Sequence, residues 1–309
     1  MSTQQAVIIE APKGPFVLRT RSIPTPSEGE VLIKIMSVGL NPVNWKQGAF
    51  NILIDEYPAV VGHDVAGVVE KLGTGVEGLK KGDRVCAQTV NVGFQQYVAV
   101  PAGIMIPTIP ALTRPLPFLW RLPRPASALF APGPIGVGLN PTFSWDKPQQ
   151  GHAALVIGGG PANFNYLGKL GATECIDRGE VPVESLAAHP ALAPPRAAGS
   201  WLPSRRRNWS EILSKRSSLL VRVLGYYAGP DVMNFKRDVV GYVGTPEHTA
   251  FGKLLIKNLP EMLERGVISG TRYEILPNGL AGISEGLDRL RQGGVSGFKL
   301  VAHPQDPVA

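Results

Sequence analysis

The feature that most constrains the fold is residues 153–157 (AALVI), an uninterrupted apolar run that ends at Gly158, Gly159 and Gly160. A short apolar run bounded by a turn predicts a strand buried on both faces, as in a parallel sheet covered by helices. Glycines directly after such a strand permit the tight turn that leads into a helix in nucleotide-binding sheets. The middle of the chain is therefore predicted to be an α/β domain.

The first hundred residues follow a different pattern, in which short strands alternate with glycine and proline turns. Residues 30–38 (EVLIKIMSV) alternate apolar and polar side chains, which predicts a half-buried strand. Small residues inside the longest run, Gly62 and Gly67, predict close backbone approach or a bulge. The region is therefore expected to form a small barrel-like β domain, with further strands at 6–9, 16–21, 60–72, 83–87 and 93–100.

The second half of the chain mixes helix and strand patterns. A helix with a kink at Pro260 is expected over 251–265, and a second helix over 280–292 ends at a pair of glycines. The remaining expected elements are a short helix at 165–170 and strands at 173–177, 219–224, 239–243 and 297–302.

Composition excludes several classes of protein. Glycine and proline together number 36 + 29 = 65 of 309 residues, which excludes a long helical bundle. Two cysteines, Cys86 and Cys175, are too few for a disulfide framework or a four-cysteine zinc site, so both are expected to be plain core residues. The sequence shows neither an apolar run of membrane-spanning length nor a secretory signal, so we expect a cytoplasmic protein and no membrane partner.

The net charge of +7 is unevenly distributed. Residues 84–145 and 185–210 contain no carboxylate and carry +4 each, which leaves 7 − 8 = −1 for the rest of the chain. The proline-rich segments 106–134 and 187–210 show neither helix nor strand period and are expected to be irregular. The arginines at 205–207 suggest a basic binding module as one alternative. Because neither an aromatic platform nor a recognition helix accompanies them, a solvated loop and no nucleic-acid partner are expected.

Four stretches carry a resemblance to a known family: EVLIKIMSVGLNPVNWKQG, YPAVVGHDVAGVVEKLG, KKGDRV and TRYEILPNGLAGISEGLDRLRQGGVSGFKLV. In order and spacing they resemble the zinc-free branch of the medium-chain dehydrogenase/reductase superfamily, which contains quinone oxidoreductases and the trans-acting enoyl reductases of fungal polyketide pathways. The resemblance implies a GroES-like β-barrel domain at 1–135, a Rossmann-type doubly wound domain at 136–270, and a return to the first domain at 271–309.

The resemblance implies an NADPH-dependent oxidoreductase that transfers hydride to the β-carbon of an activated double bond. The site must then supply a donor for the negative charge that develops on the conjugated oxygen. Lys46 aligns with a lysine implicated in catalysis in similar enoyl reductases, and the alternative is a solvated loop lysine. The implied substrate is a quinone, a simple enone or a carrier-bound enoyl group, with a polyketide synthase as a partner for the last.

The resemblance also implies further binding residues. Phe251 and Gly252 resemble the start of a helix that lines the substrate pocket. For the loop beneath the cofactor, Gly241 and Tyr242 are favoured over the similar pair at 225–226. The implied cofactor site comprises Val43, Asn44, Trp45, Lys46, Gly158, Gly159, Gly160, Gly241, Tyr242, Val295 and Ser296.

Zinc is not expected. The NPVNWK segment offers no cysteine where the zinc enzymes of the superfamily carry a ligand, and the second ligand position reads Gly62-His63-Asp64. One histidine beside one aspartate cannot supply a three-ligand catalytic site. His63 is therefore expected to be a hydrogen-bonded structural residue.

The Rossmann half departs from the family pattern. Only sixteen residues separate Gly160 from Asp177, whereas one βαβ unit needs roughly 30. The domain is therefore expected to be truncated. Asp177 is not expected to bind ribose, because its context resembles a later strand of the family. Together with the irregular segments, this motivates an alternative function, a non-catalytic or degraded family member that cannot bind the dinucleotide, and the hypothesis of an imperfect gene model.

Overall fold

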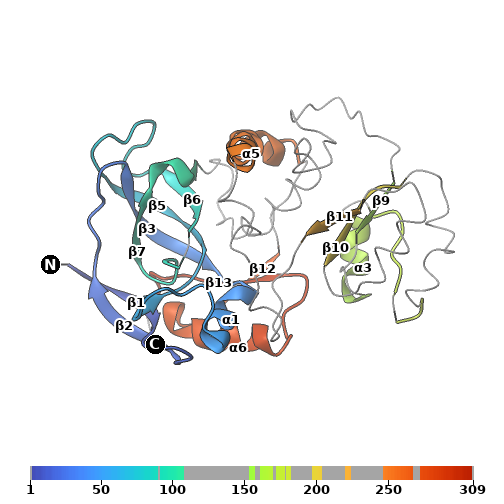
Figure 1. Ribbon diagram of the computed structural model, residues 1–309, viewed down its shortest axis with the longest axis horizontal. Coiled ribbons are helices and arrows are strands. Elements are labelled where there is room, and N and C mark those ends of the chain that lie inside the picture. Colours follow the sequence, from blue (N-terminus) through green and yellow to red (C-terminus); the bar gives the residue numbers. More distant parts are fainter. Residues whose placement is uncertain are drawn as a thin grey trace. The chain divides into compact units, whose positions relative to one another are not determined.

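The computed structural model describes residues 2–89, 91–107, 153–156, 161–169, 172–177, 179–181, 197–203, 220–223, 246–266 and 272–307. The chain divides into two compact units (Figure 1). The first joins Met1–Arg121 with Leu259–Ala309, and the second is Leu122–Asn258. The C-terminal segment thus belongs to the same unit as the N-terminal strands. The expected domain boundaries at 135 and 270 stay predictions.

The first unit is built on antiparallel sheets. In the smaller sheet β1 (Thr3–Ile9) lies between β2 (Phe16–Ser22) and β4 (Ala59–Val60). The larger sheet has the order β12-β13-β3-β5-β6-β8, and β7 also pairs with β3. Its strands are β3 (Glu30–Gly39), β5 (Asp64–Leu72), β6 (Arg84–Gln88), β7 (Tyr97–Pro101), β8 (Met105–Pro107), β12 (Tyr273–Ile275) and β13 (Lys299–Ala302).

Most strand predictions for this unit are confirmed, and two need correction. The run expected as one strand over 60–72 is divided at Gly62, which adopts a φ of +102° between β4 and β5. A left-handed φ of this kind favours glycine and interrupts the ladder. The strand expected over 93–100 begins only at Tyr97, because residue 95 makes an isolated bridge to Ala6 instead of continuing the strand.

The larger sheet surrounds an apolar core. Val31, Ile33 and Ile35 on β3 are completely buried, as their alternation in the sequence predicts. The strands β3 and β5 approach closely at Gly67, where a Cβ atom would lie 2.1 Å from the backbone oxygen of Lys34. The prediction that small residues in this run permit close backbone approach is therefore confirmed.

Two helices of the first unit pack against each other, α1 (Pro42–Phe50) and α6 (Ile283–Arg291) (Figure 1). A 3₁₀ turn over Gly279–Gly282 precedes α6, so the helix predicted over 280–292 is confirmed. It ends at Gly293, where φ is +78° and the N–H bonds to the carbonyl of Leu290. Helix α1 was not predicted, since the segment after β3 was expected to be a loop.

The second unit contains a parallel sheet of order β11-β10-β9, with the strands β9 (Ala153–Val156), β10 (Ala197–Pro203) and β11 (Leu220–Val223). Strands β9 and β11 confirm two predictions. Strand β10 shows that the expectation of an irregular segment over 187–210 was wrong in part. Its pairing with β9 and β11, both distant in sequence, orders a stretch that has no local period of its own.

The remaining described segments of the second unit are short. A 3₁₀ turn at Pro161–Asn163 leads into α3 (Phe164–Lys169), which confirms the predicted short helix. The strand predicted over 173–177 is wrong. Asp177 instead closes a turn, in which its carboxylate accepts a hydrogen bond from the N–H of Gly179 at 2.7 Å. The strand predicted over 239–243 lies outside the described residues.

Helix α5 (Pro246–Glu264) spans the boundary between the units and confirms the helix predicted over 251–265, while the kink at Pro260 stays a prediction. Its apolar face follows the helical period, with Phe251, Leu255, Leu259 and Met262 each at most 5% exposed. No helix in the described part of the chain is both long and apolar enough to cross a membrane.

Candidate functional site

The candidate site is built around α1, which begins two residues after β3 ends. Asn41 is the N-cap residue with extended backbone, and Pro42 occupies the first helical position, where its missing N–H costs nothing. The N–H of Asn41 donates to Oδ1 of Asn44 at 2.8 Å. Asn51 ends the helix in a left-handed conformation. A polar contact at the N-terminus and a left-handed residue at the C-terminus therefore define the two ends of a nine-residue helix.

Four of the predicted site residues lie on this helix. Val43 and Asn44 are buried, and Trp45 is half-buried. Lys46 is only 9% exposed, and its Nζ lies 5.6 Å from the centroid of the Trp45 ring, within reach of a cation–π contact. The alternative that Lys46 is a solvated loop lysine is therefore wrong. Phe50, 45% exposed, packs on Trp45 with ring centroids 5.8 Å apart.

A chain of side-chain amides runs along the buried side of α1. Nδ2 of Asn44 donates to Oε1 of Gln47 at 3.2 Å, and Nε2 of Gln47 donates to Oδ1 of Asn91 at 2.5 Å. Asn91 in turn donates to the carbonyl of Leu53. Because Asn44 and Gln47 are completely buried, these bonds satisfy polar groups that would otherwise be costly to remove from water.

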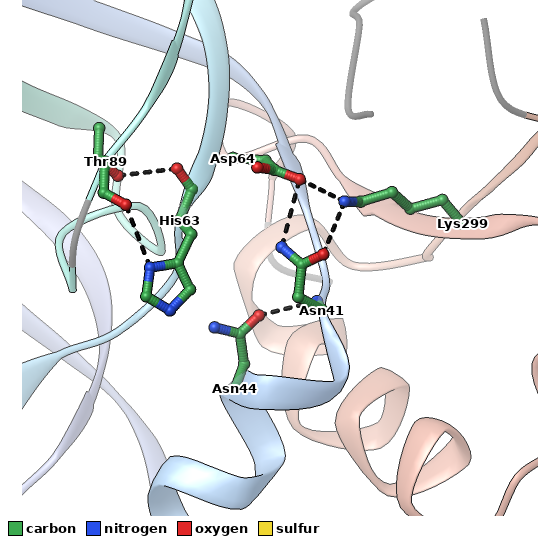
Figure 2. Close-up of polar contacts among 6 residues, drawn as sticks. All are labelled: Asn41, Asn44, His63, Asp64, Thr89 and Lys299. Atoms are coloured by element: carbon green, nitrogen blue, oxygen red, sulfur yellow. Dashed lines mark hydrogen bonds and ion pairs between the residues drawn. The ribbon is translucent and has the colours of Figure 1, made fainter. Parts of the chain in front are cut away.

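A buried ion pair lies at the start of α1 (Figure 2). Nζ of Lys299, the first residue of β13, contacts the carboxylate of Asp64, the first residue of β5. It also donates to Oδ1 of Asn41 at 2.9 Å, while Nδ2 of Asn41 donates to the same Asp64 oxygen at 3.2 Å. The side chains of Lys299 and Asp64 are 6% and 1% exposed. Three segments distant in sequence thus meet in one polar cluster.

His63 adjoins this cluster and is hydrogen-bonded, as expected. Its Nδ1 lies 3.1 Å from the carbonyl oxygen of Thr89, whose hydroxyl donates back to the carbonyl of His63 at 3.0 Å (Figure 2). Burial lowers the pKa of His63, with the Thr89 contact and the charge of Asp64 opposing the shift and the charge of Lys299 adding to it. The ring is therefore neutral near pH 7, with the proton on Nδ1.

The two cysteines lie in different environments. Cys86 on β6 is completely buried, and burial together with the charge of Asp64 raises its pKa to about 12, so its thiol stays protonated. Cys175 is half-buried, so the expectation that both cysteines are core residues holds for Cys86 alone. In the described part of the chain, no group of three or more His, Cys, Asp or Glu side chains is arranged to hold a metal ion.

The other predicted site residues are placed as follows. Val295 is half-buried and Ser296 is exposed, in the connection from α6 to β13, within the same unit as α1. Phe251 and Gly252 are buried on α5, in the part assigned to the second unit. Outside the described residues lie Gly158, Gly159, Gly160, Gly241 and Tyr242, together with the alternative pair at 225–226.

Sequence reasoning missed the polar cluster of Asn41, Asp64 and Lys299. A signal was present: Asp64 and Lys299 each stand among apolar residues in a predicted strand, and a charge in such a setting requires a partner. The helix was also recognisable, because Asn followed by Pro is a common helix start.

Comparison with known proteins agrees with this architecture. Residues 27–111 match the family model of the alcohol dehydrogenase GroES-like domain. The chain superposes with a TM-score of 0.69 on an alcohol dehydrogenase superfamily protein from Novosphingobium aromaticivorans, at 22% identity over 96% of this chain and 98% of the other. The apo form of JamJ enoyl reductase gives a TM-score of 0.70 at 13% identity, over 97% and 99% of the two chains.

Among curated proteins, trans-enoyl reductase himH of Aspergillus japonicus is 28% identical over 88% of this chain and 89% of its own length. Quinone oxidoreductase of Rattus norvegicus is 40% identical over 27% of each chain, and dehydrogenase orsE of Emericella nidulans is 30% identical over 33% of this chain and 32% of that protein. The last two matches thus span about a third or less of the relatives' length.

These findings define the fold of the chain and the family of one of its domains. Residues 27–111 form an alcohol dehydrogenase GroES-like domain, and the chain has the fold of the medium-chain dehydrogenase/reductase superfamily, with a GroES-like and a Rossmann-like part. Its relatives are oxidoreductases, and the superfamily generally uses nicotinamide dinucleotide cofactors.

Proposed function

We propose that the chain is an NADPH-dependent, zinc-independent reductase of carbon–carbon double bonds conjugated to a carbonyl group. The proposal is supported by the GroES-like domain, by relatives named trans-enoyl reductase and quinone oxidoreductase, and by the surroundings of Lys46. NADPH bound beside α1 supplies the hydride that reaches the β-carbon. The α-carbon takes up a proton from water, and the donor to the developing enolate oxygen is assigned to the chain.

The observation that carries the proposal is the burial of Lys46 on an ordered helix. Lys46 as a whole residue is only 9% exposed, and a charge in a buried setting makes stronger electrostatic contacts than a charge on a surface lysine. Negative charge develops on the carbonyl oxygen of the substrate as hydride arrives, and Lys46 is the proposed donor to that oxygen. The amide network under α1 keeps the donor in place.

The residues of α1 also suit the nicotinamide end of the cofactor. Lys46 offers N–H donors to ribose and carboxamide oxygens, and Trp45 offers an aromatic face, while the buried Asn44 amide, bonded to Asn41 and Gln47, is assigned to supporting the helix. Ser296, exposed after α6, adds a hydroxyl in the same unit. We assign Val43 and Val295 to the apolar lining, and Phe251 with Gly252 to the substrate pocket.

Zinc independence is supported by what occupies the neighbourhood of His63. The Asp64 carboxylate that follows it is engaged by the Lys299 ammonium and the Asn41 amide, and the start of α1 carries amides and a tryptophan instead of thiolate or imidazole ligands. The Lys299 ammonium already neutralises the Asp64 carboxylate, which would otherwise attract a divalent metal.

The proposed substrates are a small enone, a quinone or a carrier-bound enoyl group. The last is suggested by the himH relative and has a polyketide synthase as its proposed partner. An assay with trans-2-hexenal, 1,4-benzoquinone and an enoyl-carrier protein separates the three substrates.

A non-catalytic family member remains the alternative, and one observation favours it. Helix α3, which follows β9 and precedes the parallel strand β10, is only six residues long, and the segment over 172–177 after it is not a strand. A crossover helix this short offers less surface to a dinucleotide than a helix of ordinary length.

Titration with NADPH distinguishes the two functions. A reductase changes NADPH fluorescence at micromolar concentrations and oxidises it in the presence of trans-2-hexenal, whereas a non-catalytic member does neither. In the reductase, Lys46→Met should lower kcat/KM by about 10²- to 10³-fold, the usual effect of removing one charge-stabilising donor. Lys71→Met, which removes an exposed lysine of β5, should leave it unchanged. Equal activity of the two variants contradicts the role of Lys46.

A further inference from the structure

The buried cluster of Lys299, Asp64 and Asn41 joins three distant parts of the first unit (Figure 2). Lys299 lies 235 positions from Asp64 and 258 positions from Asn41 along the chain. Lys299 bonds to both, and Asn41 bonds to Asp64, so the three side chains form a closed triangle. The ion pair at the start of β5 and β13 thus reaches Asn41, the N-cap residue of α1.

From Asn41 the contacts continue into the helix. The backbone N–H of Asn41 donates to the Asn44 side chain, and Asn44 donates to Gln47 one turn further on. Lys46 lies between Asn44 and Gln47 in the sequence, on the same nine-residue helix. A displacement of Asn41 therefore disturbs the bonds that hold the segment carrying Lys46.

The electrostatic balance of the cluster depends on Lys299. The titratable groups that face Asp64 are the His63 imidazole, the Cys86 thiol and the Lys299 ammonium. Burial keeps His63 neutral and Cys86 protonated, so Lys299 supplies the positive charge. The second Asp64 oxygen, Oδ1, is buried and accepts no hydrogen bond from the described residues. Without Lys299, Asp64 becomes a buried carboxylate that lacks its counter-ion.

We propose that Asp64 and Lys299 are positioning residues, which act through Asn41 to hold α1 in the orientation that presents Lys46 to the substrate. The catalytic part of this inference rests on the proposed function. The mechanical part, that the ion pair holds α1, concerns the protein without cofactor and is tested separately.

The first experiment measures hydrogen–deuterium exchange of the α1 amides in the full chain without cofactor. Lys299→Met should accelerate exchange about tenfold at pH 8, a coupling within the usual range for residues of one hydrogen-bond network. Adding Asp64→Asn should reverse most of the effect, because the unbalanced charge is then gone. Lys81→Met serves as the matched control, since it breaks an exposed 2.8 Å ion pair with Glu70, which lies on β5 as Asp64 does.

The second experiment separates positioning from folding. Asn41→Ala leaves the Lys299–Asp64 pair intact and removes its link to α1. It should lower kcat for trans-2-hexenal about tenfold, with the melting temperature close to that of the wild type.

The proposal is overturned if α1 exchanges at the wild-type rate in both Lys299→Met and Asn41→Ala, or if the double variant exchanges no more slowly than Lys299→Met. If Lys299→Met does not fold, the double variant and Asn41→Ala decide by the same criteria. A wild-type chain that binds no NADPH refutes the proposed function, while the exchange data still decide whether the ion pair holds α1.

Discussion

Gly67 provides a sharp test of the packing between β3 and β5. It lies within β5, opposite Ile35 of β3 and Val85 of β6. In Gly67→Ala the new Cβ would lie 2.1 Å from the carbonyl oxygen of Lys34 and 2.8 Å from Cγ2 of Ile33. Because the first of these atoms belongs to the backbone of the neighbouring strand, a change of rotamer cannot relieve the clash.

The size of the effect follows from this geometry. Ordinary contact begins at 3.4 Å, so the strands must separate by 3.4 − 2.1 = 1.3 Å at this point. Overpacking of a core costs about 1–3 kcal/mol, and the backbone clash favours the upper end of that range. A loss of about 3 kcal/mol lowers the melting temperature by roughly 6–12 °C for a domain of this size.

Denaturant unfolding followed by circular dichroism measures this loss. Gly103→Ala is the matched control, because Gly103 lies in an exposed 3₁₀ turn where a Cβ would meet no atom within 4 Å. The control should stay within about 0.5 kcal/mol of the wild type, as surface substitutions usually do. If Gly67→Ala is as stable as the control, the strand contact at Gly67 is not the constraint inferred here.

Three further outcomes are expected from the core and the polar cluster. Cys86, with a pKa raised to about 12, should resist iodoacetamide at pH 8 in the folded chain, while the half-buried Cys175 is alkylated first. Mass spectrometry of the modified peptides reports the order of alkylation, and equal labelling of the two cysteines contradicts the prediction. Burial lowers the pKa of His63, so the unfolded chain binds a proton there that the folded chain excludes. The free energy of unfolding should therefore fall as the pH drops below about 6.5, and unfolding curves at several pH values should show a weaker decline for His63→Gln. Leu287 on α6 is 2% exposed, so Leu287→Ala should lower the free energy of unfolding by about 2–5 kcal/mol. In the same urea titration, Leu290→Ala should lower it clearly less, because Leu290 is only half-buried.

The local sequence pattern predicted much of the β architecture. Alternation over 30–38 identified β3 and its buried face, because a pleated strand exposes alternate side chains and needs no partner to reveal its period. The same reasoning located β9, α3 and α6. It failed at 173–177, a segment that runs into the turn at Asp177, and at β10, which is ordered by pairing with β9 and β11.

The candidate site was predicted unevenly. Lys46 and its neighbours were identified by resemblance, while the helix that carries them was missed although Asn41 and Pro42 mark its start. The burial of Lys46 is a property of the packed unit and cannot be read from the neighbouring residues in the sequence.

What the sequence alone determined is therefore most of the strands and helices and the class of fold, since hydrophobic period, glycine turns and helix ends act over a few residues. Only the tertiary structure decided which charged side chains contact each other. The pairing of Lys299 with Asp64 joins residues 235 positions apart, and it follows from the register of β13, β3 and β5 in one sheet. Burial makes that pairing important for stability, because a charge removed from water is costly unless a charge of opposite sign lies beside it.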